Sequence, residues 1–123
     1  MAPKSSSRRP EQVAETIRAV LAEALLRGDV RDPRVGLVTI SAVDVTRDLS
    51  HANVMVVPHG DDAAKDAALD GLTSAAGFLR RSVAQALSTR IVPELHFKLD
   101  RGFDHARRID ELLAGLRDEE PSS

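Results

Sequence analysis

Arginine side chains dominate the groups in this sequence that could bind an anion. Fourteen of its seventeen cationic residues are Arg and three are Lys, and the planar guanidinium group matches phosphate oxygens in a bidentate manner. Residues 77–101 carry a charge of +3, from five cations and two acids, in a chain whose net charge is −2. The five cations are Arg80, Arg81, Arg90, Lys98 and Arg101. The pattern predicts a phosphate-binding patch on an otherwise acidic protein. Two alternatives stay open, a solvated face without a ligand and a codon bias toward Arg.

Common catalytic and metal-binding spacings are missing from the sequence. The patterns G-x-S-x-G, H-E-x-x-H and G-x-G-x-x-G do not occur. His51, His96 and His105 have no companions at metal-ligand spacing, so we assign them no chemistry. Asp61 and Asp62 are more typical of a turn and a helix cap than of a metal site or a metal-dependent nuclease. We therefore expect a protein that is not an enzyme and that binds no metal or cofactor.

The composition is typical of one domain in a reducing compartment. The chain has 123 residues, which is enough for one hydrophobic core, and it has no cysteine. Its longest apolar run, residues 54–57, is far shorter than the roughly 20 residues that span a bilayer. With three Phe and no Trp or Tyr, the chain has little material for stacking on bases. We expect a soluble, cytoplasmic monomer without a membrane segment.

A helical pattern in the middle of the chain passes through a glycine. Apolar residues recur every three or four positions and form one buried face: Ala64, Ala68, Leu72, Ala75, Ala76, Leu79, Val83, Ala86 and Leu87. Gly77 lies within this pattern, although glycine costs about 1 kcal/mol relative to alanine in a helix. It indicates a kink, a close backbone approach or a junction between two short helices. A merely tolerated glycine is the alternative.

The first two predicted elements of the chain are a helix and a strand. Pro10 suits the first turn of a helix, and Gly28 ends the apolar stripe that follows it. The β-branched segment 35–45 is typical of a long strand, but its alternation changes phase along its length. A bulge near Ser41 and Ala42 would bring both halves to the same face.

Two further strands complete the predicted sheet. The second strand places Ala52, Val54 and Val56 on its inner face, and its short link to the first strand predicts antiparallel pairing. Pro58 ends it, and Asp61 or Asp62 is expected to cap the bent helix. A third strand opens at Pro93 and alternates cleanly, with three residues pointing inward and two outward: Leu95, Phe97 and Leu99 against His96 and Lys98.

This order of elements predicts an α+β fold in which helices pack on one face of a three-stranded sheet. A final short helix would hold Ile109, Leu112, Leu113 and Leu116. We divide the chain into a flexible basic tail over residues 1–9, a single domain over residues 10–117 and a disordered acidic end over residues 118–123.

Five stretches of the sequence carry a resemblance to a known family: residues 32–34, 38–54, 75–80, 92–100 and 108–113. Their order and spacing resemble those of the ribosome-binding factor A family over about residues 11–113. The resemblance implies a KH-like domain of the bacterial type (type II), with the order α-β-β-α-kink-α-β plus a short C-terminal helix. In this family an Ala-x-Gly kink replaces the G-x-x-G loop of other KH domains, and here it would be Ala75-Ala76-Gly77. One departure from the family pattern is Arg101-Gly102, where an acid and a serine are common.

The resemblance also implies a function. Members of the family bind the small (30S) ribosomal subunit and its 16S rRNA late in maturation, support processing of the rRNA 5′ end and leave before translation, often with a role in cold adaptation. A release GTPase as a further partner is left open by the sequence. A protein-interaction module that docks on another maturation factor or on a ribosomal protein is the alternative.

Charge and position then suggest which residues contact the RNA. We expect phosphate contacts from cations beside and after the kink, extended by Arg101 and by a basic N-terminal tail: Arg80, Arg81, Arg90, Lys98, Lys4, Arg8 and Arg9. Ala75 and Gly77 would allow the RNA backbone to approach the protein backbone closely. The alternative at Arg101 is a surface substitution without effect on binding.

Overall fold

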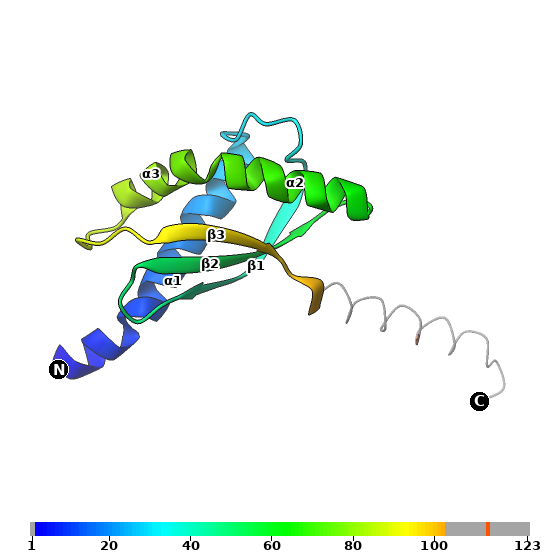
Figure 1. Ribbon diagram of the computed structural model, residues 1–123. Coiled ribbons are helices and arrows are strands. Elements are labelled where there is room, and N and C mark those ends of the chain that lie inside the picture. The colour runs from blue at the N-terminus through cyan, green and yellow to red at the C-terminus, as the bar shows by residue number, and fades with distance from the viewer. Residues whose placement is uncertain (1, 103–112, 114–123) are drawn as a thin grey trace.

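The computed structural model describes residues 2–102 and 113, with backbone only for residues 2–8. Its elements follow the order α1 (Ala2–Arg27), β1 (Val38–Val45), β2 (His51–Pro58), α2 (Asp62–Ser74), α3 (Ala76–Ala86) and β3 (Glu94–Leu99) (Figure 1). This order confirms the predicted α+β class. The predicted final helix and acidic end lie outside the described residues, apart from Leu113, which is helical and 48% exposed.

The sheet has the order β1-β2-β3 and mixes two kinds of pairing. β1 and β2 are antiparallel, as predicted, whereas β2 and β3 are parallel, with His51 opposite Glu94 and Val54 opposite Phe97. The register of β1 shifts between Ile40 and Ala42, which confirms the predicted bulge. Because of the bulge, Ile40 and Val45 are both buried in the core although they are five positions apart.

The core lies between one face of the sheet and the three helices. Ala52, Val54 and Val56 of β2 are fully buried, as predicted, and they pack in one cluster with Leu95 and Phe97 of β3. The helices close this face with seven buried apolar side chains: Val13, Ile17, Leu21, Ala24, Leu72, Leu79 and Val83. The opposite face of the sheet has no helix over it among the described residues, and its side chains are exposed or half-buried.

The first helix begins earlier than the sequence predicts. It runs from Ala2 to Arg27 with Pro10 inside it, so the predicted start at Pro10 is wrong and residues 2–9 continue the helix. Proline inside a helix loses one backbone hydrogen bond and crowds the carbonyl four positions before it, but its φ angle is compatible with the helix. The lysine and arginines before Pro10 are good helix formers. The division of the chain into tails and a domain remains a prediction.

Candidate nucleic-acid interface

The bent helix is two helices joined at a single residue. Asp61 caps α2 by accepting a hydrogen bond on Oδ1 from the amide of Ala64 at 2.8 Å. Ala75, with φ −87° and ψ 0°, ends α2 and starts α3. Its amide donates to the carbonyls of Gly71 and Leu72, both at 3.1 Å, so the backbone stays hydrogen-bonded through the bend.

Gly77 lies in the first turn of α3, after the break, and its φ angle is outside the left-handed region. A Cβ built on it meets nothing within 4 Å. The break that the sequence places at Ala75-Ala76-Gly77 therefore occurs at Ala75, and the protein's own packing does not require the glycine.

The loop between α1 and β1 braces the end of α2. Asp32 accepts hydrogen bonds from Nε and Nη2 of the Arg34 guanidinium, the shortest at 2.6 Å from Nη2, and another from the Arg34 amide at 2.9 Å. These bonds hold the pKa of Asp32 down at about 2, and the same pair raises the pKa of Arg34. Nη2 of Arg34 also donates to Oγ of Ser74 at 3.3 Å, one residue before the break. The loop and the break are thus held as one surface.

Gly71 of α2 allows the loop between α1 and β1 to pack closely against this helix. A Cβ at position 71 would lie 2.6 Å from Cγ2 of Val35 and 3.3 Å from Cβ of Arg34, so only glycine lets the loop pack this closely. Because Val35 of this loop packs against Gly71, the strand that the sequence predicts from Val35 begins only at Val38.

A groove of about 720 Å³ lies beside the break, between α2, α3 and the loop after α1. Phe78 lines it and is 41% exposed, while Arg27 and Arg31 line the loop side. Arg81 lies one turn after Phe78 on α3, at the i, i+3 spacing that places side chains side by side. The exposed ring can stack on a base, and Arg81 beside it can hold a phosphate. On the loop side, Arg27 is ion-paired with Glu23 at 3.1 Å and with Asp29 at 3.9 Å, so it is less available for a phosphate.

The structure gives the two adjacent arginines different surroundings. Nη2 of Arg80 donates to the carbonyl of Val92 at 2.8 Å and ties α3 to the segment before β3. Arg81 is exposed, and no ion pair or hydrogen bond of its side chain occurs within residues 9–102. Arg90 is exposed on the same connecting segment as Val92. Arg80, Arg81 and Arg90 therefore lie in one region, with Arg81 and Arg90 the more available for a ligand.

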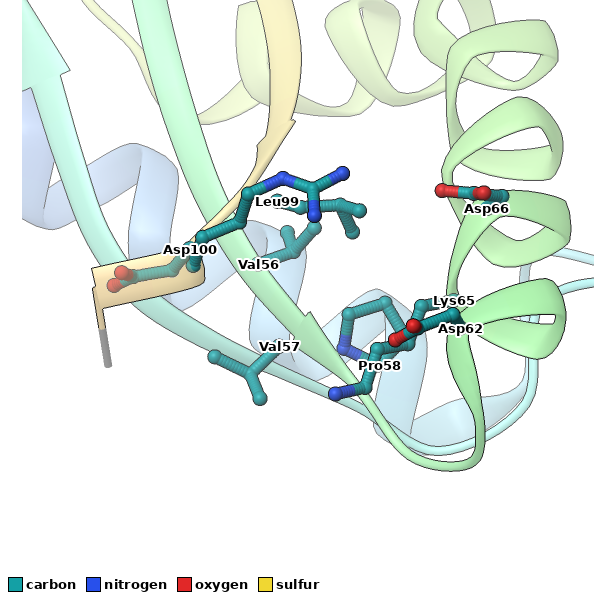
Figure 2. Close-up of a pocket in the computed structure, with 9 residues that line it drawn as sticks. Val56, Val57, Pro58, Asp62, Lys65, Asp66, Leu99 and Asp100 are labelled. Carbon is teal, nitrogen blue, oxygen red and sulfur yellow. The ribbon is translucent and has the colours of Figure 1, made fainter. Parts of the chain in front are cut away.

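Lys98 and Arg101 lie elsewhere. Lys98 is exposed on the open face of the sheet, opposite Met55. Arg101 follows the far end of β3 and lines a pocket of about 170 Å³ whose other charged groups are mostly acidic. Figure 2 shows Asp62 and Asp66 of α2 facing this pocket. Nearby carboxylates weaken attraction to phosphate, so the predicted extension of the patch to Arg101 has little support.

The basic residues of the N-terminal segment are carried on α1. Arg9 is exposed, and the side chains of Lys4 and Arg8 lie outside the described part of the chain. Their role in binding RNA remains a prediction.

Sequence reasoning missed Arg27, Arg31 and Phe78 as candidate ligand contacts. Arg27 and Arg31 are far in sequence from the cationic segment 77–101, and the small number of aromatic residues gives no reason to expect stacking at Phe78. Their proximity depends on the turn after α1, where Gly28 adopts a left-handed φ of 74°. A glycine at the end of a helix is the one local signal that points to this turn.

The statement that His51 and His96 have no companions is wrong. Nδ1 of His51 lies 2.9 Å from Nε2 of His96, and the two rings are 5.1 Å apart. Parallel pairing of β2 with β3 creates this contact, and the sequence contains no local signal for the pairing.

The α-β-β-α-α-β order, the three-stranded mixed sheet and the helix break define a KH-like α+β domain with a candidate RNA-binding face beside the break. The model of one family, ribosome-binding factor A, matches residues 9–113. The chain belongs to the ribosome-binding factor A family.

Individual members support the assignment. The ribosome-binding factor A of Desulforamulus reducens is 44% identical over 93% of this chain and 94% of that protein. The crystal structure of the factor from Thermus thermophilus superposes with a TM-score of 0.64 and 27% identity over 75% of this chain and 97% of the other. Coordinates of a Thermus thermophilus homology model, fitted into a cryo-electron-microscopy map of a 30S complex, match with a TM-score of 0.53 and 30% identity over 70% of this chain and 93% of that one.

None of the helices within the described residues combines the length and the apolar character needed to cross a membrane.

Proposed function

We propose that this protein is a non-enzymatic assembly factor of the cytoplasm that binds the small ribosomal subunit and its 16S rRNA. It acts late in maturation, supports processing of the rRNA 5′ end and leaves before translation, with a role in adaptation to cold. The observation that carries the proposal is membership of the ribosome-binding factor A family over residues 9–113. The related Thermus thermophilus factor has been fitted into a map of a 30S complex.

The face beside the helix break is the part of the molecule best suited to RNA. Arg81 lies on α3 after the break, and Arg90 lies on the segment that follows the other end of α3. Both offer exposed guanidinium groups for phosphate oxygens, and Phe78 offers a ring for a single unpaired base. Gly77 leaves open space above the first turn of α3, where a phosphate backbone can approach the protein backbone. Such a face acts by binding the RNA and makes or breaks no covalent bond.

Cells that lack the protein test the maturation role. We expect them to accumulate small-subunit particles whose 16S rRNA keeps an unprocessed 5′ end, more strongly at low temperature. The native gene should restore processing, and a variant carrying both Arg81→Ala and Arg90→Ala should not. Normal 5′ ends in the deletion strain at every temperature would contradict the proposal.

A protein-interaction module is the second candidate, and one observation favours it. Leu26 is 89% exposed and Leu37 is 79% exposed, and both line one groove between α1 and β1. A protein partner would cover such a patch. The two candidates differ in salt dependence, because binding through phosphates weakens steeply between about 50 and 200 mM salt.

A further inference from the structure

Three potential metal ligands come together on the open face of the sheet. Nδ1 of His51 lies 2.9 Å from Nε2 of His96 and 3.9 Å from a carboxylate oxygen of Glu94. One ligand atom from each of the three residues falls within 4.8 Å of the other two. His51 is far in sequence from the other two and meets them because the parallel register places it opposite Glu94, with His96 two positions further along the same face.

Backbone hydrogen bonds fix the positions of these residues. The Glu94 amide donates to the carbonyl of Ser50 at 2.9 Å, and the Thr46 amide donates to the carbonyl of His51 at 3.0 Å. The His51 amide donates to Oγ1 of Thr46 at 3.2 Å. The ligands therefore project from two paired strands, which hold a site more accurately than a loop does.

Acidic groups lie at the His51 and Glu94 end of the cluster, whereas Lys98 follows His96 on the same face. Glu94 supplies one carboxylate, and Asp48 lies close enough to His51 for an electrostatic interaction. Hydrogen bonds from the hydroxyl groups of Ser50 and Thr46 hold the pKa of Asp48 down at about 2, so this carboxylate is ionised at neutral pH. No Lys or Arg forms an ion pair with Glu94 among residues 9–102.

We propose that His51, Glu94 and His96 form a site for a divalent transition-metal ion of the Zn²⁺ type. Two imidazole nitrogens and one carboxylate are a common set of zinc ligands and leave a fourth position for water. Ligand atoms of a tetrahedral zinc ion are about 3.3 Å apart, given bonds of about 2.0–2.1 Å. The observed separations of 2.9 and 3.9 Å lie on either side of this value, so small rotations of exposed side chains complete the geometry.

The site would join the start of β3 to the start of β2 and so stabilise the folded state. A metal that binds only the folded protein raises its thermal midpoint as the metal concentration increases. The proposal is independent of RNA binding, because the three residues lie on the open face of the sheet and the helix break lies over the other face.

The test is titration of the untagged, full-length protein with ZnCl₂ in a calorimeter, with Co²⁺ as a spectroscopic probe of coordination. We expect one zinc ion per chain, and we expect His51→Gln and His96→Gln each to weaken binding at least tenfold. Glu94→Gln should also weaken binding, but by less, because the amide oxygen can still coordinate the ion although it is a poorer ligand than the carboxylate. His59→Gln is the matched control, since His59 is exposed and lies outside the cluster. It should bind zinc as the native chain does.

Two readouts other than affinity accompany the titration. Co²⁺ should give the visible absorption bands of a four-coordinate ion with the native chain and with His59→Gln, and not with a His51→Gln/His96→Gln double variant. Zinc should raise the thermal midpoint of the same two proteins and leave that of the double variant unchanged. Circular dichroism checks that every variant is folded. Zinc binding by the native chain that is no tighter than binding by the double variant would overturn the proposal.

Discussion

Nη2 of Arg80 donates a hydrogen bond to the backbone carbonyl of Val92 at 2.8 Å and so ties α3 to the segment that leads into β3. The next residue, Arg81, is exposed and makes no comparable contact within residues 9–102. Two arginines that look equivalent in the sequence therefore have different roles. Arg80 positions the connecting segment that carries Arg90, and Arg81 is available for a ligand.

Alanine substitutions at these two positions should separate stability from binding. Arg80→Ala loses a hydrogen bond from a charged donor on the surface, so we expect the free energy of unfolding to fall by about 1 kcal/mol. Arg81→Ala should change it by less than about 0.5 kcal/mol and should be the one that weakens binding to the small subunit. Urea unfolding of both variants measures the first effect. Equal losses of stability would show that the Arg80 contact does not form in solution.

Gly77→Ala should make the protein more stable and a poorer ligand for the ribosome. Gly77 is helical and a Cβ there meets nothing within 4 Å, so we expect the free energy of unfolding to rise by up to about 1 kcal/mol. The same methyl group would occupy the space into which we place the RNA backbone, and affinity should fall roughly tenfold, or about 1.4 kcal/mol. Gly36→Ala is the control, because it also has open space around it. Unchanged affinity in Gly77→Ala would place the RNA elsewhere.

Gly71→Ala should destabilise the fold even though alanine favours helices. The new Cβ would lie 2.6 Å from Cγ2 of Val35, and the loop that braces α2 would have to move. We expect a loss of about 1–3 kcal/mol in the free energy of unfolding. Adding Val35→Ala removes the clashing methyl group and should recover part of the loss in a double-mutant cycle. Additive effects of the two substitutions would contradict the proposed contact.

The turn between β1 and β2 should give the protein an acid-sensitive component of stability. The pKa of Asp48 is lowered to about 2 by hydrogen bonds from Ser50 and Thr46, against about 3.9 in an unfolded chain. The resulting stability is fully present above the unfolded value and is lost as the pH falls through the folded value. Between about pH 4 and pH 2, stability should therefore fall less in Asp48→Asn than in the native chain.

Chemical denaturation at a series of pH values measures this difference. Asp44→Asn removes an exposed strand carboxylate that makes no hydrogen bond within the described part of the chain and should keep the native profile. An identical pH profile for Asp48→Asn and the native chain would rule out the proposed role of Asp48.

Local patterns in the sequence were enough to predict most of the fold. Alternation identified the buried face of β2, the phase change in β1 identified the bulge at Ser41, and two adjacent acids identified the Asp61 cap. Each of these features depends on residues close together in the chain. The helical start at Ala2 differs from the prediction because a proline favours the first turn of a helix, whereas α1 continues through Pro10.

The candidate site was harder to predict because it depends on contacts between distant segments. The groove needs the loop after α1 to meet the helix break, and the His51–His96 contact needs a parallel register between β2 and β3. The charge pattern groups Arg80, Arg81 and Arg90, which are close in sequence, and their role in binding RNA stays a prediction. It also includes Lys98 and Arg101, which lie on other parts of the surface. The alternation of β3 puts Lys98 on the open face of the sheet, and Arg101 follows the end of β3 beside an acidic pocket.

The central claim is that exposed arginines on α3 and on the segment that follows it bind rRNA of the small subunit. Co-sedimentation of the purified protein with small subunits, large subunits and assembled ribosomes over a salt series tests it most directly. Arg81→Ala with Arg90→Ala is compared with Arg18→Ala, an exposed arginine on the β1 side of α1. We expect salt-sensitive binding to small subunits alone, and a weaker, less salt-dependent interaction for the double variant only. Native affinity and salt dependence in the double variant would contradict the claim.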